Sequence, residues 1–177
     1  MNPPDMLAAW KRGDIDGGYV WHPTLQSMVD DGGKILIHSG DLIDQGIVTA
    51  DVIVVRREFA KAHPELVVDY LKSQIRAVET YRHSPDQAVA AVAKEFSLKQ
   101  VETDQMMREL VWLSGEEQKD DQFIGNTEKT GQFANVLLDT AHFLHDQGLI
   151  DNVPDSDVFK RAVAPEYLDK ALQQEGN

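Results

Sequence analysis

The sequence predicts an α/β fold with a few parallel strands, followed by a helix-rich C-terminal part. Short apolar runs alternate with helix-like segments before residue 56, and this alternation is typical of parallel strands that share one sheet. After that point the apolar residues recur three to four positions apart, which is the spacing of amphipathic helices. Hydrophobic residues make up 42% of the 177 residues, enough to build a packed core.

The first part of the chain contains a short apolar run that points to a ligand site. Tyr19–Trp21 lies between Gly17-Gly18 and His22-Pro23, so we expect a strand buried on both faces. Ligands of open α/β sheets bind beyond the carboxyl ends of the strands, which makes Trp21 and His22 candidates. The elements expected here are a helix at 5–10 capped by Asp5, strands at 19–21, 34–38 and 50–55, and a helix that starts at Pro23 and ends at 30–33.

The second part predicts helices alone. Ser84-Pro85-Asp86-Gln87 matches a capping box with proline at the first helical position, and Thr103 is expected to cap another helix. Five helices without a strand among them are more than a three-stranded sheet needs, so we expect further strands to precede residue 1. The other helices expected are 64–82, 131–147 and 165–172, with a polar loop at 115–131.

Composition excludes several classes of function. Asp and Glu number 30 against 17 Lys and Arg, a net charge of −13, which argues against nucleic acid and anionic membranes as partners. No cysteine is present, so disulfides and thiolate chemistry are excluded. No stretch approaches the roughly 18 apolar residues of a membrane span. The first residues lack a basic and an apolar region, so we expect no signal peptide in this chain.

Three short motifs suggest sites that we reject. Arg12-Gly13-Asp14 is an adhesion tripeptide elsewhere, but here it falls at a helix end. Residues 14–18 resemble part of a calcium loop that lacks its third early ligand and its terminal Glu. His142 and His145 lie three apart on a helix without a third ligand nearby. We therefore expect no metal and no cofactor.

Three longer segments carry a family resemblance. The stretches PPDMLAAWKRGDIDGGYVWHP, TADVIVVRREFAKAHPELV and LLDTAHFLHDQGLI resemble the C-terminal half of the taurine-binding proteins of bacterial ABC importers. That family belongs to the type II periplasmic binding proteins, with the sulfonate, nitrate and thiamine-precursor binders. The similarity is close from Pro3 to about Ile75 and looser after Ser84.

The resemblance implies an incomplete two-lobed clamp. Residues 1–48 would form the C-terminal part of the second lobe, residues 49–55 a crossover strand at the hinge, and residues 56–177 the helical remainder of the first lobe. A small zwitterion such as taurine would be captured by hinge closure, and permease subunits of the importer would be the protein partners. The protein would then be no enzyme, and its location would be periplasmic.

Asp51 is the first candidate ligand-binding residue. It stands directly before Val52–Val55, and a carboxylate at the mouth of a buried strand needs a cation or several donors. The resemblance implies that Asp51 meets the ammonium group of the ligand. The structural alternative is an acid that pairs with an arginine or with the backbone at the start of a strand.

The remaining candidates are Trp21, Tyr19, His22 and Thr49. The ring of Trp21 would face an ammonium group, and this cation–π interaction would contribute about 1 kcal/mol or more. Tyr19 lies on the same face of the predicted strand as Trp21. His22 and Thr49 are weaker candidates for polar contacts with the ligand. The alternatives are a core tryptophan and a solvated loop histidine.

Two further readings of the function stay open at this point. The same fold hosts a thiamine-pyrimidine synthase that uses a pyridoxal cofactor, but no suitable lysine and histidine pair lies near Trp21 or Asp51. The chain could also be a fragment that binds no ligand and self-associates through unpaired strand edges.

Overall fold

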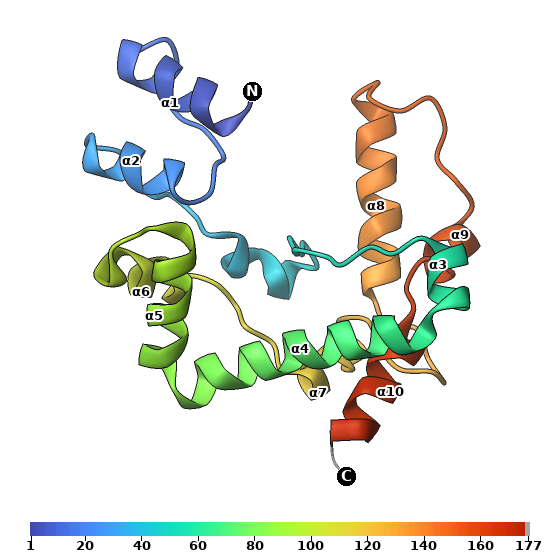
Figure 1. The fold of residues 1–177 in the computed structure, drawn as a ribbon. Coiled ribbons are helices and arrows are strands. Elements are labelled where there is room, and N and C mark those ends of the chain that lie inside the picture. The colour runs from blue at the N-terminus through green and yellow to red at the C-terminus, as the bar shows by residue number, and fades with distance from the viewer. Residues whose placement is uncertain (176–177) are drawn as a thin grey trace. The chain divides into compact units, whose positions relative to one another are not determined.

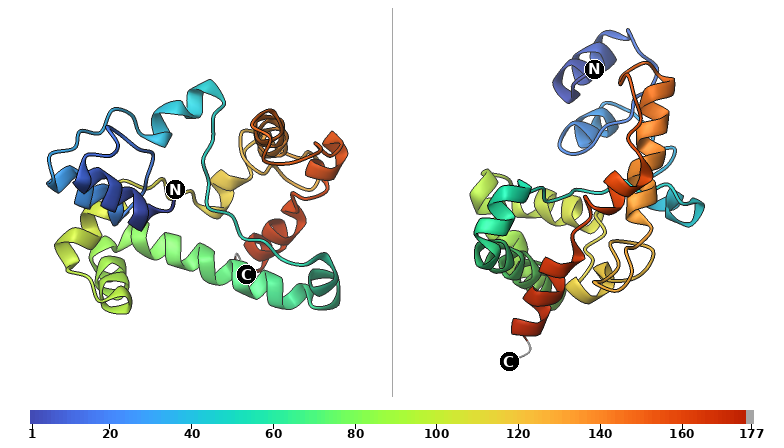
Figure 2. Two further views of the ribbon diagram at one scale, coloured as in Figure 1. Left: turned by 90° about the horizontal axis from the view of Figure 1, so that it is seen from above. Right: turned by 90° about the vertical axis from the view of Figure 1, so that its right-hand side faces the viewer.

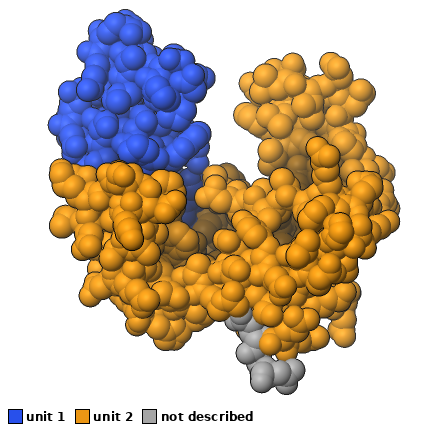
Figure 3. Space-filling view, viewed as in Figure 1, with its two compact units in different colours: residues 1–42 blue, residues 43–177 orange. Residues whose placement is uncertain are grey.

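The computed structural model describes residues 1–175 and divides the chain into two compact units, residues 1–42 and residue 43 onward (Figure 3). Helices dominate both units (Figure 1). No β-strand forms among residues 1–175, and an isolated bridge between Gly125 and Thr130 is the sole β-pairing found there. The helix-rich C-terminal part is confirmed, whereas the prediction of a parallel sheet is wrong for the described chain.

The three predicted strands are exposed segments without regular structure. Leu36 in the 34–38 run is 93% exposed, Trp21 is 62% exposed, and Val54 in the 50–55 run is 86% exposed. A strand persists only when neighbouring strands supply hydrogen bonds and cross-strand side chains. The described residues offer no such neighbour, so apolar and β-branched composition alone does not produce a sheet.

Two helices build the first unit. Helix α1, Pro3–Arg12, ends at Gly13, whose φ of 73° places it in the left-handed region that favours glycine. Helix α2, Thr24–Asp30, follows the cis His22–Pro23 peptide. Trp10 Nε1 donates to Asp31 Oδ2 at 3.0 Å, and this bond joins the end of α1 to the end of α2.

The start of α1 differs from the prediction in its capping residue. The side chain of Asn2 accepts a hydrogen bond from the backbone N–H of Asp5 at 3.0 Å, so Asn2 caps the helix and Asp5 lies in its first turn. Two prolines occupy the first helical positions, where a missing N–H costs nothing. The helix therefore begins two residues before the predicted start.

The rest of the chain contains one 3₁₀ helix and eight α-helices within the described range. The 3₁₀ helix η1, Ser39–Gln45, crosses the boundary between the units. The α-helices are α3 Arg57–Ala62, α4 Pro64–His83, α5 Pro85–Phe96, α6 Gln100–Arg108, α7 Gly115–Gln118, α8 Phe133–Asp146, α9 Ser156–Lys160 and α10 Pro165–Glu175.

The five helices predicted after residue 56 form as α4, α5, α6, α8 and α10, but α3 and α9 were not predicted. Helix α7 begins inside the segment 115–131 that was expected to be a loop, so that prediction is wrong at its start. The predicted caps are also wrong. Ser84 precedes α5 without a side-chain capping bond. Thr103 lies inside α6, where it is 1% exposed and its hydroxyl donates to the Lys99 carbonyl at 3.0 Å. The capping box of this unit is instead Ser114 with Glu117, at the start of α7.

The core of the second unit lies where α10 packs across α4, as Figures 1 and 2 both show. Val68 and Ile75 of α4 are 4% and 8% exposed, and Leu168 and Ala171 of α10 are 4% and 0% exposed. Four partly buried residues pack against this core, namely Leu71, Ile124, Tyr167 and Leu172. Helix α5 in turn packs on α4 and α6 packs on α5.

Candidate functional site

The predicted ligand-binding residues are divided between the two units. Tyr19, Trp21 and His22 belong to the first unit, and Thr49 and Asp51 belong to the second. The structure therefore groups them only within each unit.

Within the first unit, two of the three candidates are exposed. Tyr19 is 66% exposed, and its hydroxyl lies 2.8 Å from Ser39 Oγ, which ties the segment after α1 to the start of η1. Trp21 is 62% exposed, and its carbonyl accepts from Leu25 N at 3.0 Å in the first turn of α2. His22 is half-buried next to Pro23. An exposed indole leaves a ring face available to a cation.

Asp51 and Thr49 lie in an extended, exposed segment between η1 and α3. The expected burial of Asp51 at the mouth of a strand is wrong, because no strand forms there. The Asp51 side chain makes no hydrogen bond or ion pair with the part of the chain that the structure describes. The structural alternative, a pairing with an arginine or with the backbone, is thus not formed among residues 1–175, and the carboxylate is accessible to a ligand.

The second unit contains a pocket whose lining includes Val48, the residue directly before Thr49. Its volume is about 300 Å³, at the lower end of the range for small-molecule sites. Gly46, with a φ of 78°, turns the chain at its wall. The lining residues are Ile43, Gly46, Val48, Gln122, Gln132, Asn135, Val136 and Asp139.

The chemistry of this pocket suits a small polar molecule. Three amide side chains supply both donors and acceptors, and one of them, Asn135 Nδ2, donates to Gln132 Oε1 at 2.6 Å. Asp139, one turn further along α8, adds a carboxylate that can accept from an ammonium. The sequence analysis missed these residues. Gln132, Asn135 and Asp139 follow a helical spacing of three and four, which was the available signal.

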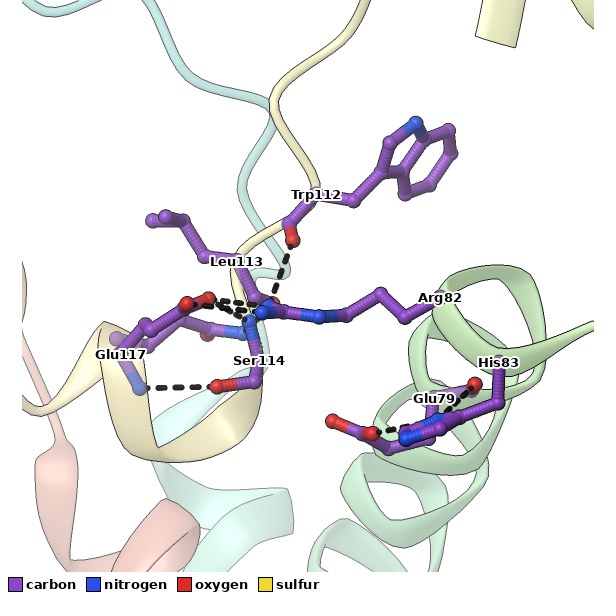
Figure 4. A network of polar contacts seen from close by, with 8 residues as sticks. Glu79, Arg82, His83, Trp112, Leu113, Ser114 and Glu117 are labelled. Carbon is purple, nitrogen blue, oxygen red and sulfur yellow. Dashed lines mark hydrogen bonds and ion pairs between the residues drawn. The ribbon is translucent and has the colours of Figure 1, made fainter. Parts of the chain in front are cut away.

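A polar network holds α7 against the end of α4 (Figure 4). Arg82 donates to both carboxylate oxygens of Glu117, with Nη2 to Oε1 at 3.0 Å, and its Nη1 also donates to the Trp112 carbonyl at 3.3 Å. Ser114 N donates to Glu117 Oε2 at 2.7 Å. These bonds lower the pKa of Glu117 to about 2, with the Arg82 hydrogen bond as the largest cause. The network braces the fold by joining α4 to α7.

The Arg82–Glu117 pair predicts a pH-dependent contribution to stability. Because the pKa of Glu117 is lowered on folding, the contribution is complete above its ordinary value of about 4.5 and is lost as the pH falls to about 2. The difference in melting temperature between the wild type and Glu117→Gln should therefore shrink over this range. Thermal unfolding at several pH values measures it.

Arg82→Leu removes the donor of the same pair and serves as the matched control. The difference in melting temperature between the wild type and Arg82→Leu should shrink over the same pH range. A difference that stays constant from pH 5 to pH 2 in both variants would contradict the assignment of this effect to the pair.

The Arg12-Gly13-Asp14 tripeptide lies at the end of α1, as the sequence predicts. Arg12 Nε pairs with Asp14 Oδ2 at 2.7 Å on either side of the α1 terminus, so the tripeptide is a helix end. Among residues 1–175, no group of three or more His, Asp or Glu side chains is placed to hold a metal ion. No helix in the described chain has the length and apolar character needed to cross a membrane.

Comparison with known families gives the class of the protein. Residues 1–100 match the model of the substrate-binding domain of the ABC-type glycine betaine transport system. The chain therefore belongs to this family of substrate-binding domains.

Two curated proteins resemble the chain within that class. It is 34% identical over 159 residues to the taurine-binding periplasmic protein of Escherichia coli (strain K12). This alignment covers 86% of this chain and 47% of the relative. It is 31% identical over 91 residues to a putative aliphatic sulfonates-binding protein of Bacillus subtilis (strain 168). This alignment covers 50% of this chain and 26% of the relative. The chain thus spans about half of the first relative and a quarter of the second. No solved structure matches it.

The family resemblance inferred from the sequence is confirmed. The relatives are binding proteins by name, so at the level of the family the chain is grouped with non-enzymes and the synthase-like alternative is not favoured. The two-lobed type II architecture and the domain boundaries at 48 and 55 stay predictions.

Proposed function

We propose that this chain acts as the substrate-binding part of an ABC importer, and that its ligand is taurine or a related aminosulfonate. The observation that supports the proposal most strongly is the 34% identity to a taurine-binding periplasmic protein across 86% of this chain. The second relative is assigned to aliphatic sulfonates, which carry the same anionic group. A periplasmic location and permease subunits as partners follow from the same relationship.

In the proposed mechanism Asp51 accepts the ammonium group of the ligand. Its carboxylate is exposed and lacks a partner within residues 1–175, so binding replaces water rather than breaking an existing ion pair. A charge-assisted hydrogen bond from the ammonium would favour ligands that carry a cationic end. Closure of a hinge around the ligand, expected from the family, would exclude water and strengthen this pair.

Trp21, Tyr19, His22 and Thr49 are proposed as secondary contacts. The Trp21 ring can face the ammonium, and the hydroxyls of Tyr19 and Thr49 can donate to sulfonate oxygens. The protein would then discriminate between ligands by their ammonium group and their sulfonate group. Glycine betaine, the ligand in the name of the matched family model, has a quaternary ammonium that cannot donate a hydrogen bond to Asp51.

The test is calorimetric titration of the full chain with taurine. We expect Asp51→Asn to weaken taurine binding by about tenfold or more, since hydrogen bonds to charged groups contribute about 1.5–3 kcal/mol. Ethanesulfonate, which lacks the amine, should bind the wild type and Asp51→Asn with similar affinity. Asp146→Asn, at a side chain 78% exposed on α8, is the matched control and should leave taurine binding unchanged.

Two results would contradict parts of the proposal. Absence of binding heat from a folded chain, across taurine, ethanesulfonate and glycine betaine, would contradict the binding function of this chain. Loss of taurine binding in Asp139→Asn but not in Asp51→Asn would move the ligand to the amide-lined pocket of the second unit.

A further inference from the structure

The amide-lined pocket of the second unit is enclosed by three segments of that unit, namely residues 43–48, the loop at Gln122 and the first turns of α8. Its volume of about 300 Å³ equals that of roughly ten water molecules, since one water occupies about 30 Å³ in the liquid. The polar lining residues are exposed, so the pocket opens to solvent. A molecule of up to about ten non-hydrogen atoms therefore fits and can enter.

Backbone hydrogen bonds fix the loop wall of the pocket against α8. The Gln132 N–H donates to the Asp121 carbonyl at 2.7 Å, and the Phe133 N–H donates to the Phe123 carbonyl at 2.9 Å. The two acceptors flank Gln122 in the chain, so its amide is held beside the first turn of α8. Walls that are fixed before a ligand arrives lower the entropic cost of binding.

The available polar atoms define what the pocket can hold. The Asp139 side chain makes no hydrogen bond or ion pair with the part of the chain that the structure describes. Asn135 Nδ2 donates to Gln132 Oε1 at 2.6 Å, which leaves Asn135 Oδ1 as an acceptor and Gln132 Nε2 as a donor. The pocket therefore offers two kinds of acceptor, a carboxylate and an amide oxygen, together with amide N–H donors.

The charge of the pocket favours a cation. Asp139 is the one charged residue in the lining that the structure describes. Asp44, exposed in the turn between Ile43 and Gly46, adds a second carboxylate to the same wall segment. A positive ligand is attracted by these charges, whereas the anionic end of a zwitterion finds no cation in the lining. A molecule with a single positive charge therefore suits this pocket better than taurine does.

The lining also selects among kinds of cation. Quaternary ammonium groups are recognised by aromatic rings, and the described lining residues include none. A primary ammonium can instead donate hydrogen bonds to the carboxylate and to the amide oxygen. Ile43, Val48 and Val136 supply apolar surface for a short methylene chain, and an amide N–H can donate to a hydroxyl at its other end.

We propose that the amide-lined pocket is a second binding site of this protein, and that it takes a small amino alcohol with a primary ammonium at one end and a hydroxyl at the other. Asp139 and Asn135 Oδ1 accept from the ammonium, and Gln132 Nε2 donates to the hydroxyl. This inference uses none of the residues assigned to taurine above, and it is independent of that ligand.

The test is a titration of the full ¹⁵N-labelled chain with 5-amino-1-pentanol, followed by nuclear magnetic resonance in the absence of taurine. We expect saturable shifts of the side-chain amide signals of Gln122, Gln132 and Asn135. 1-Pentanol, which lacks the ammonium, should bind at least about tenfold more weakly, since hydrogen bonds to charged groups contribute about 1.5–3 kcal/mol. The zwitterion 5-aminopentanoate should also bind more weakly than the amino alcohol.

Asp139→Asn identifies the group that binds the ammonium. Because Asp139 is exposed, the variant should keep the circular dichroism of the wild type, while its affinity for 5-amino-1-pentanol should fall by about tenfold or more. Asp146→Asn, at a side chain 78% exposed on the same helix, is the matched control and should leave this affinity unchanged. Asp51→Asn should leave it unchanged as well, which separates this site from the proposed taurine site.

Three outcomes would overturn the inference. The first is a folded chain whose amide signals show no saturable shift with 5-amino-1-pentanol. The second is an affinity that Asp139→Asn leaves intact. The third is equal affinity for 5-aminopentanoate, which would show that the pocket does not select a single positive charge. A chain that fails to bind taurine changes none of these results.

Discussion

Leu168→Ala is expected to lower the free energy of unfolding of the second unit by about 3 kcal/mol, since truncation of a buried leucine costs about 2–5 kcal/mol. Leu168 is 4% exposed in the α4–α10 core, beside Val68, Ile75 and Ala171. The loss combines the lost burial of the side chain with the cavity that remains, because two crossing helices cannot close it without moving as a whole. Chemical denaturation with the circular dichroism signal as readout measures the change.

The matched control for this prediction is Leu149→Ala. Leu149 is 69% exposed after the end of α8, so its truncation should change the free energy of unfolding by less than about 0.5 kcal/mol. Equal effects of the two substitutions would show that the α4–α10 contact is not the core of this unit.

Asp169→Ala is expected to cost about 2 kcal/mol, because it removes hydrogen bonds to a charged group, which contribute about 1.5–3 kcal/mol. Asp169 is 9% exposed on α10. Its Oδ2 accepts from Thr127 N at 3.0 Å and from Thr127 Oγ1 at 2.8 Å, and its Oδ1 lies 3.2 Å from Lys119 Nζ. The carboxylate thereby fastens the loop after α7 to the core helix.

The pKa of Asp169 reflects both its burial and its contacts with Thr127 and Lys119. Burial, the largest single influence, acts to raise the pKa, but the hydrogen bonds from Thr127 and the contacts with Lys119 together hold it below its ordinary value. Asp169→Asn keeps an oxygen acceptor for Thr127 and removes the charge that faces Lys119. It should therefore be less destabilising than Asp169→Ala.

Denaturant unfolding of both Asp169 variants, with Asp146→Ala as the exposed control, tests this prediction. Asp146 is 78% exposed in its side chain, and its truncation should be nearly neutral. An Asp169→Ala variant as stable as the control would show that the loop is not fastened through this carboxylate.

The longer helices of this protein could be predicted from its sequence because their signals are local, whereas the short helices α3, α7 and α9 were missed. Pro64 and Pro85 sit at the first positions of α4 and α5, and the apolar spacing of three to four residues marks the faces that pack. The caps were less predictable. Whether a hydroxyl reaches a free N–H depends on the backbone angles before the helix, and this is why Ser84 fails to cap α5 whereas Ser114 caps α7.

The candidate site was predictable only in part. The exposed carboxylate of Asp51 belongs to a segment that the sequence singles out, and the family resemblance drawn from the same stretch is confirmed. The amide-lined pocket joins a turn at Gly46 to Gln122 and to the first turns of α8. The helical spacing of Gln132, Asn135 and Asp139 was a local signal, but their meeting with Gly46 and Gln122 depends on folding and no local pattern predicts it.

By itself, the sequence determined the family, the positions of the main helices and the absence of thiol chemistry, because composition, periodicity and similarity are properties of the chain alone. Only the tertiary structure decided that residues 50–55 stay exposed and that Asp169 fastens a loop to the core. The physical reason is the difference in range of the interactions. A helix satisfies its backbone hydrogen bonds within one segment, whereas a strand needs a neighbouring strand. Among residues 1–175 no strand forms beside residues 50–55.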